Sequence, residues 1–516
     1  MMRARDLSLP ILAAAVAVLL AAGPSQAQPG DVENGERVYT ERCTWCHGED
    51  GDGLGPVEER LNPPPRDFTG GQYKIKTTAF DDIVPNDDDL FRMVRDGMPG
   101  TAMPGWADVL SEQEMWDLVA FIKTFAGYDE ETPTSQVDYG TQVASSAESI
   151  EKGRQLYFDG DRCSECHGVE GKGDAIKKLK GDNGERTWPR NLTKPWTFRA
   201  SADPKDIFTR ITVGIPGTQM PSFADPQSKK SLGIEERWHI ANYVVSLAKT
   251  TEVVRSENTV VKAAEAEGGV PEAPDDPRWE EAPPSTFFLV PQIIAKERFF
   301  TPSNDTITVR AFYDEKIIAV LLEWDDRTKS IPGDAKAESI ADPDMGEDSV
   351  AIQLPVVIPE GMEKPYFGMG DPAKPVNIWQ WTSGTTDRSE TVRLLTGRGF
   401  GDIEERDLAD AGITARGIYK TGTWRVVMTR PRMTAKPEND IQLVEGKFIP
   451  VAFAAWDGSN GETGSKHTMT TWYWLLLEPQ TGTKPYFVAI GVVIVIVAGQ
   501  FAWVRSAARS KANDSA

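Results

Sequence analysis

The chain has 516 residues, which at about 150 residues per domain suggests three domains plus short appendages. Its 56 Lys and Arg residues and 78 Asp and Glu residues give a formal charge of −22, which excludes a nucleic-acid binder that relies on phosphate contacts. An apolar fraction of 40% excludes disorder of the whole chain, and 4 Cys residues are too few for a disulfide-rich scaffold.

The N-terminus has the three regions of a secretory signal. Two arginines precede an apolar run over residues 7–22, and small residues follow that run up to Ala27. We therefore expect a signal peptide over residues 1–27, with cleavage after Ala27 and export of the remaining chain.

Two units of similar size repeat after this segment. Each begins with a Cys-x-x-Cys-His motif and later contains the motif Gly-x-Pro-Gly-Thr-x-Met-Pro, at nearly the same separation in both units. We expect one domain over residues 28–126 and a second over residues 149–248. A linker over residues 127–148 is predicted between them.

The cysteine motif is an attachment site for haem c. Two thiols one helical turn apart can form thioether bonds to the haem vinyl groups, while the adjacent imidazole reaches the iron. A later methionine supplies a soft sulfur ligand on the opposite side of the iron. The predicted sets are Cys43, Cys46, His47 and Met103 in the first unit, and Cys163, Cys166, His167 and Met220 in the second. Met98 is an alternative to Met103.

Both units resemble class I c-type cytochromes, which implies α-helical domains. Apolar periodicity predicts a closing helix over residues 112–125 in the first unit and 234–247 in the second. His239 on the second of these helices is expected to pack or to face solvent rather than bind iron. Because two axial ligands saturate each iron, we expect electron transfer and no catalysis at these haems.

The third region follows a charged stretch over residues 249–274, which predicts an extended linker. Short apolar runs separated by turn residues then predict an antiparallel β-sandwich over residues 275–480, without a catalytic triad, phosphate loop or dinucleotide-binding fingerprint. The expected strands are 306–313, 317–324, 349–357, 423–428, 448–455 and 471–477.

Scattered aromatic motifs in this region resemble the haem b subunit of ethylbenzene dehydrogenase and its relatives, the γ subunits of the type II dimethyl sulfoxide reductase family. The motifs are Trp-Asp-Asp at 324–326, Tyr-Phe-Gly-Met-Gly at 366–370, and the segments 375–381, 422–427, 456–458, 464–466 and 472–473. The resemblance implies a β-sandwich that holds one haem b between Met369 and Lys466.

Chemistry permits this pair of ligands. A lysine binds iron only as the neutral amine, so its site has to exclude water. Trp379, Trp381 and Trp472 are candidates for the apolar surroundings. His467 is the alternative to Lys466, because imidazole is the commoner haem ligand.

An apolar run over residues 486–504 predicts a transmembrane helix, since about 20 apolar residues cross a bilayer. Basic residues follow this run, which predicts a cytoplasmic tail over residues 505–516. The bulk of the chain is then expected in the periplasm, anchored in the inner membrane.

These features together predict a membrane-anchored electron-transfer subunit with two haem c groups and one haem b. The resemblance implies iron–sulfur and molybdopterin subunits of an oxidoreductase as partners, with a nitrite- or nitrate-type enzyme favoured. A soluble cytochrome c or a terminal oxidase is expected as the other electron partner. The alternative is an independent respiratory cytochrome with two haems, whose β-sandwich binds a small molecule or a partner instead of haem b.

Overall fold

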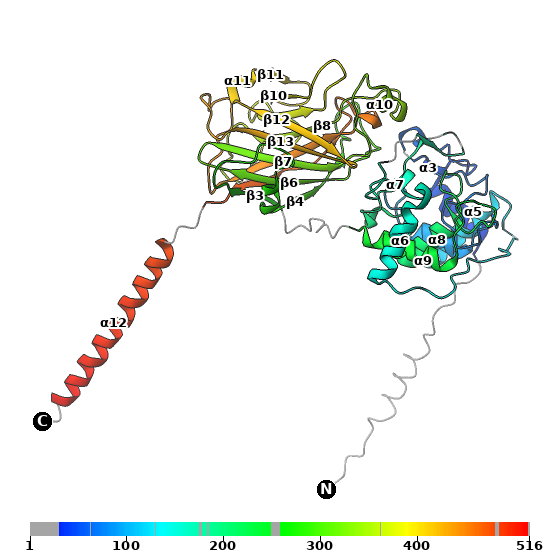
Figure 1. Cartoon of the computed structure of the whole chain (residues 1–516), viewed down its shortest axis with the longest axis horizontal. Coiled ribbons are helices and arrows are strands. Elements are labelled where there is room, and N and C mark those ends of the chain that lie inside the picture. Colours follow the sequence, from blue (N-terminus) through cyan, green and yellow to red (C-terminus); the bar gives the residue numbers. More distant parts are fainter. Residues whose placement is uncertain are drawn as a thin grey trace, which may run out of the picture.

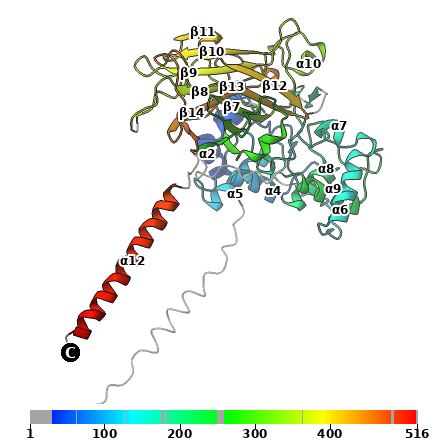
Figure 2. The same cartoon turned by 60° about the vertical axis from the view of Figure 1, so that its left-hand side comes forward.

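The structure is a computed structural model that describes residues 30–513 except 62, 130, 175–177, 183, 185, 249–258, 362 and 480–483. Two helical domains, a β domain and a C-terminal helix follow one another along the chain (Figures 1 and 2). The predicted signal peptide over residues 1–27 lies outside the described residues.

The first helical domain is built from short helices with capping residues at their ends. α5 begins where the Ser111 hydroxyl accepts the Glu114 N–H and the Glu114 carboxylate accepts the Ser111 N–H. α4 ends at Gly97, whose φ of +70° favours glycine. The elements are α2 (Val32–Arg42), α3 (Thr44–His47), η1 (Glu58–Arg60), α4 (Asp87–Asp96) and α5 (Glu112–Thr124), the last of which is the predicted closing helix.

The second helical domain repeats this arrangement. Asp203 caps α8 by accepting the Lys205 N–H, and Gly214, at φ +71°, ends it. The elements are α6 (Ala147–Phe158), η2 (Asp159–Asp161), α7 (Ser164–His167), β1 (Leu179–Lys180), β2 (Arg186–Thr187), η3 (Pro195–Thr197), α8 (Pro204–Val213) and α9 (Ile234–Ser246). α9 is the predicted closing helix. His239 on α9 is buried, with its Nδ1 2.8 Å from the Ser149 Oγ, so it packs inside the domain.

The first and last helices of each helical domain pack against each other, α2 on α5 and α6 on α9. A glycine lies at each crossing. A Cβ placed on Gly35 would be 2.1 Å from the Asp117 carbonyl oxygen, and one on Gly153 would be 2.0 Å from the His239 carbonyl oxygen. Since no side chain fits at such distances, the two glycines set the spacing of these helix pairs.

The β domain contains a 14-stranded sheet, whose main path has the order β11-β10-β9-β8-β14-β16-β3-β6-β7-β13-β12. Neighbouring strands run antiparallel, except that β3 is parallel to both β16 and β6. The strands are β3 (Val260–Glu265), β4 (Ser285–Phe288), β5 (Val290–Pro291), β6 (Thr306–Tyr313), β7 (Ile317–Asp325), β8 (Ser349–Pro355), β9 (Val376–Thr382), β10 (Thr391–Gly397), β11 (Ile403–Arg406), β12 (Thr414–Lys420), β13 (Thr423–Pro431), β14 (Phe448–Trp456), β15 (Thr468–Met469) and β16 (Tyr473–Leu477).

Short helices lie between these strands: η4 (Pro277–Glu281), α10 (Ala335–Ile340), α11 (Leu408–Ala411) and η5 (Gly458–Asn460). The six predicted strands are found as β6, β7, β8, β13, β14 and β16. The structure therefore confirms a large β-sheet region where the sequence predicted an antiparallel β-sandwich. It differs from the prediction in β3, which pairs in parallel with β16 and β6.

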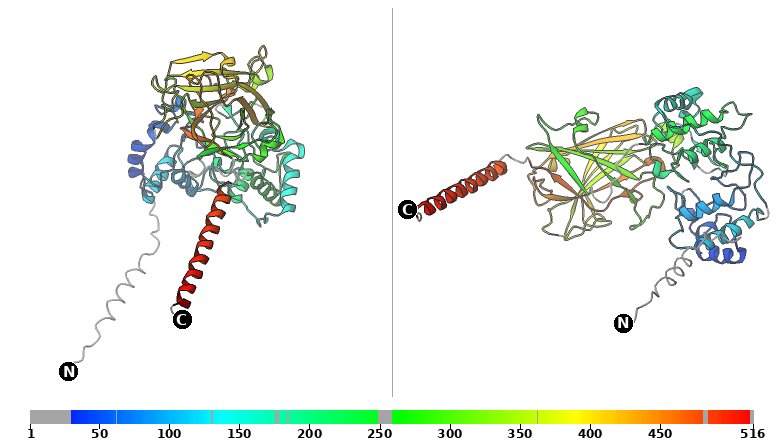
Figure 3. Two further views of the ribbon diagram at one scale, coloured as in Figure 1. Left: turned by 90° about the vertical axis from the view of Figure 1, so that its left-hand side faces the viewer. Right: turned by 90° about the horizontal axis from the view of Figure 1, so that it is seen from below.

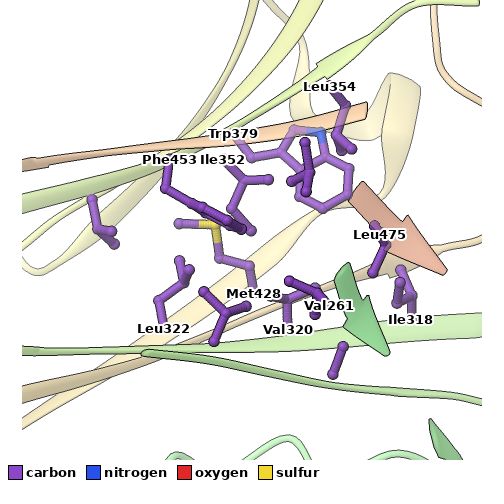
Figure 4. Close-up of a cluster of buried hydrophobic side chains, with 14 of the residues drawn as sticks. Val261, Ile318, Val320, Leu322, Ile352, Leu354, Trp379, Met428, Phe453 and Leu475 are labelled. Atoms are coloured by element: carbon purple, nitrogen blue, oxygen red, sulfur yellow. The ribbon is translucent and has the colours of Figure 1, made fainter. Parts of the chain in front are cut away.

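One hydrophobic core fills the space between the two halves of this sheet. Ile352 of β8 and Trp379 of β9 meet Val320 of β7 and Met428 of β13, and all four side chains are buried (Figure 4). Alternation along each strand directs every second side chain into this core. Burial of apolar area, at about 25 cal/mol per Å², is the main stabilising contribution of such a core.

Two segments predicted as linkers contribute to packing. Val137 is buried in the core of the second helical domain, and the Asp82 carboxylate accepts hydrogen bonds from Thr134 and Ser135. β3 lies inside the predicted linker over residues 249–274, and Val261 and Ala263 on it point into the β-domain core. The linker prediction is therefore wrong for β3, because its alternating apolar side chains complete the sheet.

The C-terminal helix α12 (Lys484–Asn513) covers the run for which the sequence predicts a transmembrane helix over residues 486–504. In the part of the chain that the structure describes, no helix has both the length and the apolar character that a membrane span requires. The predicted span is therefore not supported by the structure.

The second helical domain contacts both other domains (Figure 3). On one side, Arg92 of α4 binds Asp206 of α8 through two hydrogen bonds of 2.8 and 2.5 Å. On the other side, the Lys194 Nζ lies 2.5 Å from the Asp305 Oδ1 of the β domain. The second helical domain thus occupies the middle of the described molecule.

Candidate haem sites

The first Cys-x-x-Cys-His motif forms the short helix α3, which brings Cys43 and Cys46 onto successive turns. The His47 Nδ1–H donates to the Arg66 carbonyl oxygen at 3.1 Å, and this leaves Nε2 available for a metal. Burial lowers the pKa of His47, so its imidazole is neutral at pH 7. Both properties suit an axial iron ligand.

The second motif has the same geometry on α7. The His167 Nδ1–H donates to the Arg190 carbonyl oxygen at 3.0 Å, and burial again lowers the pKa of this histidine. None of the four cysteines, all within the described residues, forms a disulfide. The two predicted sites therefore share a local structure that holds one imidazole nitrogen for a metal.

The methionine motifs form matching loops. The Met103 N–H donates to the Thr101 hydroxyl at 3.1 Å, and the Met220 N–H donates to the Thr218 hydroxyl at 3.2 Å. In the first loop the Met98 N–H donates to the Met103 carbonyl oxygen at 3.1 Å. The residue that makes this bond in the second loop is Ile215, which has no sulfur. The shared ligand position of the two loops is therefore that of Met103 and Met220, which favours Met103 over Met98.

A cavity of about 310 Å³ brings the predicted ligands of the second site together, since Cys163, Cys166, His167 and Met220 all line it. Apolar side chains make up much of the remaining wall, among them Leu192, Phe198, Ile207, Ile211, Phe223, Ile240 and Val244. Paired thiols, an oriented imidazole and a thioether around an apolar space fit a covalently bound haem.

Residues from all three domains line this cavity. Gly100 of the first helical domain, in the loop that carries Met103, and Arg327 and Asn460 of the β domain lie in its wall. The second site is therefore completed by its neighbours, which the sequence did not indicate. Arginines and loop residues scattered along the chain have no spacing that would reveal such a convergence.

Of the two predicted haem b ligands, Met369 lies on the outer face of the half-sheet formed by β8, β9, β10 and β14. Met369 packs against an apolar cluster there, together with Trp472. The cluster consists of Ala351, Val376, Ile378, Leu395 and Trp456. Met369 has a φ of +66°, an unfavourable conformation for a residue with a Cβ, which neighbouring Gly370 and Gly397 accommodate.

The two candidate partners of Met369 lie in different surroundings. Lys466 is 41% exposed, with its Nζ 3.3 Å from the Glu297 Oε2. His467 is buried and stacks on Trp456 at 4.6 Å between ring centroids, with its Nδ1–H donating to the Gly464 carbonyl oxygen. Burial lowers the pKa of His467 to about 4, so its ring is neutral. His467 thus contacts the cluster beside Met369, whereas Lys466 forms an ion pair.

The predicted tryptophans divide between the two faces of the sheet. Trp379 and Trp381 are buried in the internal core, whereas Trp472 packs on the outer cluster with Met369. Trp456, which belongs to the segment 456–458 that carries the family resemblance, is a buried aromatic residue of that outer cluster. Alternation along β9 explains why Trp379 and Trp381 share the inner face, because residues two apart in a strand point to the same side, whereas Trp472 comes just before β16.

Three family models match consecutive parts of the chain. Cytochrome C oxidase, cbb3-type, subunit III matches residues 30–122, and Cytochrome c matches residues 150–248. Ethylbenzene dehydrogenase matches residues 276–398 and 391–468. These matches cover both helical domains and most of the β domain.

Individual relatives match parts of the chain. A Haloferax mediterranei protein named as a respiratory nitrate reductase heme subunit is 26% identical over 232 residues, which are 44% of this chain and 78% of the relative. The chlorate reductase subunit gamma of Ideonella dechloratans is 28% identical over 222 residues, 42% of this chain and 84% of the relative. A chain of the reducing HAO-like protein complex of Kuenenia stuttgartiensis is 34% identical, with 43% of this chain and 100% of that chain covered and a TM-score of 0.40.

The repeated motif geometry, the family matches and the relatives agree with one another. Two cytochrome c domains imply haem c, and two of the relatives are named as a heme subunit of a respiratory nitrate reductase and as a chlorate reductase gamma subunit. The chain therefore joins two cytochrome c domains to a domain of the ethylbenzene dehydrogenase family, which is the composition of an electron-transfer subunit.

Proposed function

We propose that this chain carries two haem c groups and one haem b, and relays electrons between a molybdenum oxidoreductase and the respiratory chain. The observation that carries the proposal is the convergence of two thiols, an oriented imidazole and a methionine on one cavity, with the same motif geometry repeated in the first domain. The bound haem supplies iron that cycles between the ferric and ferrous states by one electron.

The residues of each haem c site have separate tasks. Cys43 and Cys46, like Cys163 and Cys166, would attach the haem covalently through thioether bonds. The hydrogen bond from each histidine Nδ1–H to a backbone carbonyl fixes the ring and leaves Nε2 to hold the haem iron. Met103 and Met220 would hold the iron through their thioethers, which would keep small substrates away from it and favour electron transfer over catalysis.

Haem b would bind on the outer face of the half-sheet of β8, β9, β10 and β14, with Met369 as one ligand and Lys466 as the other, as the family resemblance implies. Lysine would have to leave Glu297 and lose its proton to bind iron. His467 is a second candidate for this position, because it is already neutral and buried beside Trp456.

The partners follow from the named relatives. Because one relative is named as a nitrate reductase heme subunit and another as a chlorate reductase gamma subunit, a molybdopterin subunit and an iron–sulfur subunit are the proposed partners on one side. A nitrite- or nitrate-type enzyme is favoured among them. A soluble cytochrome c or a terminal oxidase is the proposed partner on the other side, and the signal-like N-terminus supports a periplasmic location.

A pyridine haemochrome assay on the purified full-length protein tests the haem content. We expect two haem c and one extractable haem b per chain. Two haem c without haem b in a folded protein would contradict the haem b site and favour the independent cytochrome with a binding β domain. Recovery of molybdenum and iron–sulfur subunits in a pull-down from the native host tests the partners.

The haem b ligand is tested by Met369→Ala, Lys466→Ala and His467→Ala, with Lys447→Ala as an exposed lysine control from the same domain. Loss of haem b in Met369→Ala and Lys466→Ala, but not in the other two, would support the lysine. Loss in His467→Ala with retention in Lys466→Ala would assign the imidazole instead.

A further inference from the structure

The cavity of the second cytochrome domain is lined by an unusual set of charges for an acidic protein. Seven basic residues line it, with no acidic side chain among the described lining residues. They are Lys74, Arg162, Arg186, Arg190, Arg199, Arg210 and Arg327. Since like charges in a space shielded from water repel one another, this set needs an explanation.

Three of the seven have partners that explain them. Arg162 pairs with Asp159 at 3.1 Å, and Arg186 pairs with Asp342 at 2.8 Å. Arg210 donates to the carbonyl oxygens of Lys74 and Lys76. These contacts satisfy only part of each guanidinium group, because the Nε atoms of Arg162, Arg186 and Arg210 are buried without an acceptor.

The other three arginines, Arg190, Arg199 and Arg327, form no ion pair with any described residue, and we call them the cavity arginines. Burial, and then Arg66 and Arg327, lower the pKa of Arg199 to about 10. The Arg199 Nε is buried without a hydrogen-bond acceptor.

Lys74 shows the same effect, because burial and the charges of Arg66 and Arg199 lower its pKa to about 8. Burial also lowers the pKa of Arg327, which lies over the Trp188 ring, although the charges of Asp457 and Asp326 oppose this shift. Several guanidinium groups on one cavity, without an ion pair to a described residue, indicate a site for an anion with several oxygen atoms. The carboxylates of the haem propionates have this chemistry, and they belong to the group that the cysteines and His167 would hold in the same cavity.

We propose that the cavity arginines bind the propionates of the haem in the second cytochrome domain, and that Arg327 supplies part of this site from the β domain. This proposal rests on the proposed haem c content. Arg327 follows the end of β7, where Asp325 lies 3.4 Å from Lys194 of the second domain, so docking of the two domains delivers Arg327 to the cavity.

A consequence is that the β domain tunes the reduction potential of this haem. A positive charge beside the propionates stabilises the ferrous state, because reduction removes one positive charge from the iron. Removal of Arg327 is therefore expected to lower the potential of the second haem c and to leave the first nearly unchanged.

Redox titration of the purified full-length protein tests this, with absorption followed as a function of ambient potential. Arg327→Gln is expected to lower the ferrous-to-ferric ratio of one haem c about tenfold at fixed potential, a shift of about 59 mV downward. Arg327→Lys, which keeps the charge, is expected to restore most of the shift. Arg393→Gln is the control, because Arg393 is exposed, pairs with Glu405 and does not line the cavity.

Other outcomes are decisive as well. Unchanged potentials in Arg327→Gln, with two haem c groups still bound, would overturn the proposal and leave the proposed haem content intact. Fewer than two haem c groups in the unmodified protein would overturn the proposed function itself. If inorganic phosphate at constant ionic strength shifts the potential of the native protein but not of Arg327→Gln, the arginines bind a free anion instead.

Discussion

One hydrogen bond orients each histidine that is proposed as an iron ligand in the cytochrome c domains. The His47 and His167 rings each donate Nδ1–H to a backbone carbonyl, and burial lowers the pKa of both. A neutral imidazole in a fixed orientation would bind iron without rearrangement at each electron transfer. In the second domain, Met220 lines the same cavity as His167.

Met103→Ala is expected to remove the sulfur ligand of the first haem c and to lower the reduction potential of that haem. The far-red charge-transfer absorption of the oxidised protein should lose the contribution of this haem. Met98→Ala is the matched control, because Ile215 replaces Met98 in the second loop. The absorption spectrum of the oxidised protein checks this. A loss of the band in Met98→Ala, but not in Met103→Ala, would contradict the assignment.

A second residue-scale prediction concerns buried carboxylates in the β domain. Asp326, Asp348 and Asp457 are buried, and their carboxylate oxygens lie within 4.8 Å of one another. Burial and Asp457 raise the pKa of Asp348 to about 7, and burial and Asp457 raise that of the neighbouring Glu462 to about 8. Burial and Asp348 also raise the pKa of Asp326.

Because these pKa values are higher in the folded than in the unfolded state, the folded state holds more protons between about pH 4 and pH 8. The free energy of unfolding should therefore fall as pH rises through this range, by about 1.4 kcal/mol for each unit of pKa difference. Thermal unfolding of the holoprotein between pH 5 and pH 8 measures this.

Asp326→Asn should weaken the pH dependence and raise the unfolding temperature at pH 8, because it replaces an Oδ2 that has no hydrogen-bond partner. Asp387→Asn, at an exposed position, is the control. If EDTA lowers the unfolding temperature of the native protein at pH 8, a bound cation and not protons neutralises the cluster, and this prediction is wrong.

At the scale of elements, the helix crossings α2–α5 and α6–α9 each depend on one glycine. A Cβ on Gly153 would be 2.0 Å from a backbone oxygen of α9, which is too short for any side chain. The closing helix has to remain in place because its residues Ile240 and Val244 line the haem cavity. The spacing between α6 and α9 therefore affects how closely α9 encloses the cavity.

Gly153→Ala is expected to destabilise the second cytochrome domain by about 1–3 kcal/mol or more, because the helices have to separate. Lys152→Ala on the same helix is the control, since the Lys152 side chain is 48% exposed and pairs with Glu148 only at the surface. The unfolding temperature and the haem c content per chain check this. Equal unfolding temperatures of the two variants would show that α6 can shift without cost.

At the scale of the whole molecule, basic residues of the second cytochrome domain bind acidic residues of the β domain. Lys194 is 11% exposed and lies 2.5 Å from Asp305 and 3.4 Å from Asp325. The Arg186 side chain also donates to Asp342. Buried pairs of this kind fix the orientation of two domains, since each charge loses its water on docking.

Lys194→Ala is expected to remove the ion pairs that Lys194 forms with Asp305 and Asp325 at this interface, and to cost about 3 kcal/mol of docking free energy. Hydrogen exchange of the segment 301–306 should become faster, because Asp305 and Thr306 lose their contact with Lys194. Lys180→Ala, at an exposed position of the same domain, is the control. Unchanged exchange in Lys194→Ala would mean that other contacts hold the domains together.

The sequence by itself determined the type of the two helical domains, and it predicted their haem c sites, because the residues within Cys-x-x-Cys-His and within Gly-Thr-x-Met-Pro have a fixed local spacing. It also predicted β6 correctly, because the alternation of buried and less buried residues along this strand is a local pattern. Only the tertiary structure decided the parallel pairing of β3, the burial of His467 and the convergence of Arg190, Arg199 and Arg327 on one cavity. These depend on contacts between residues far apart in the chain, and such contacts have no local periodicity or spacing from which they can be inferred.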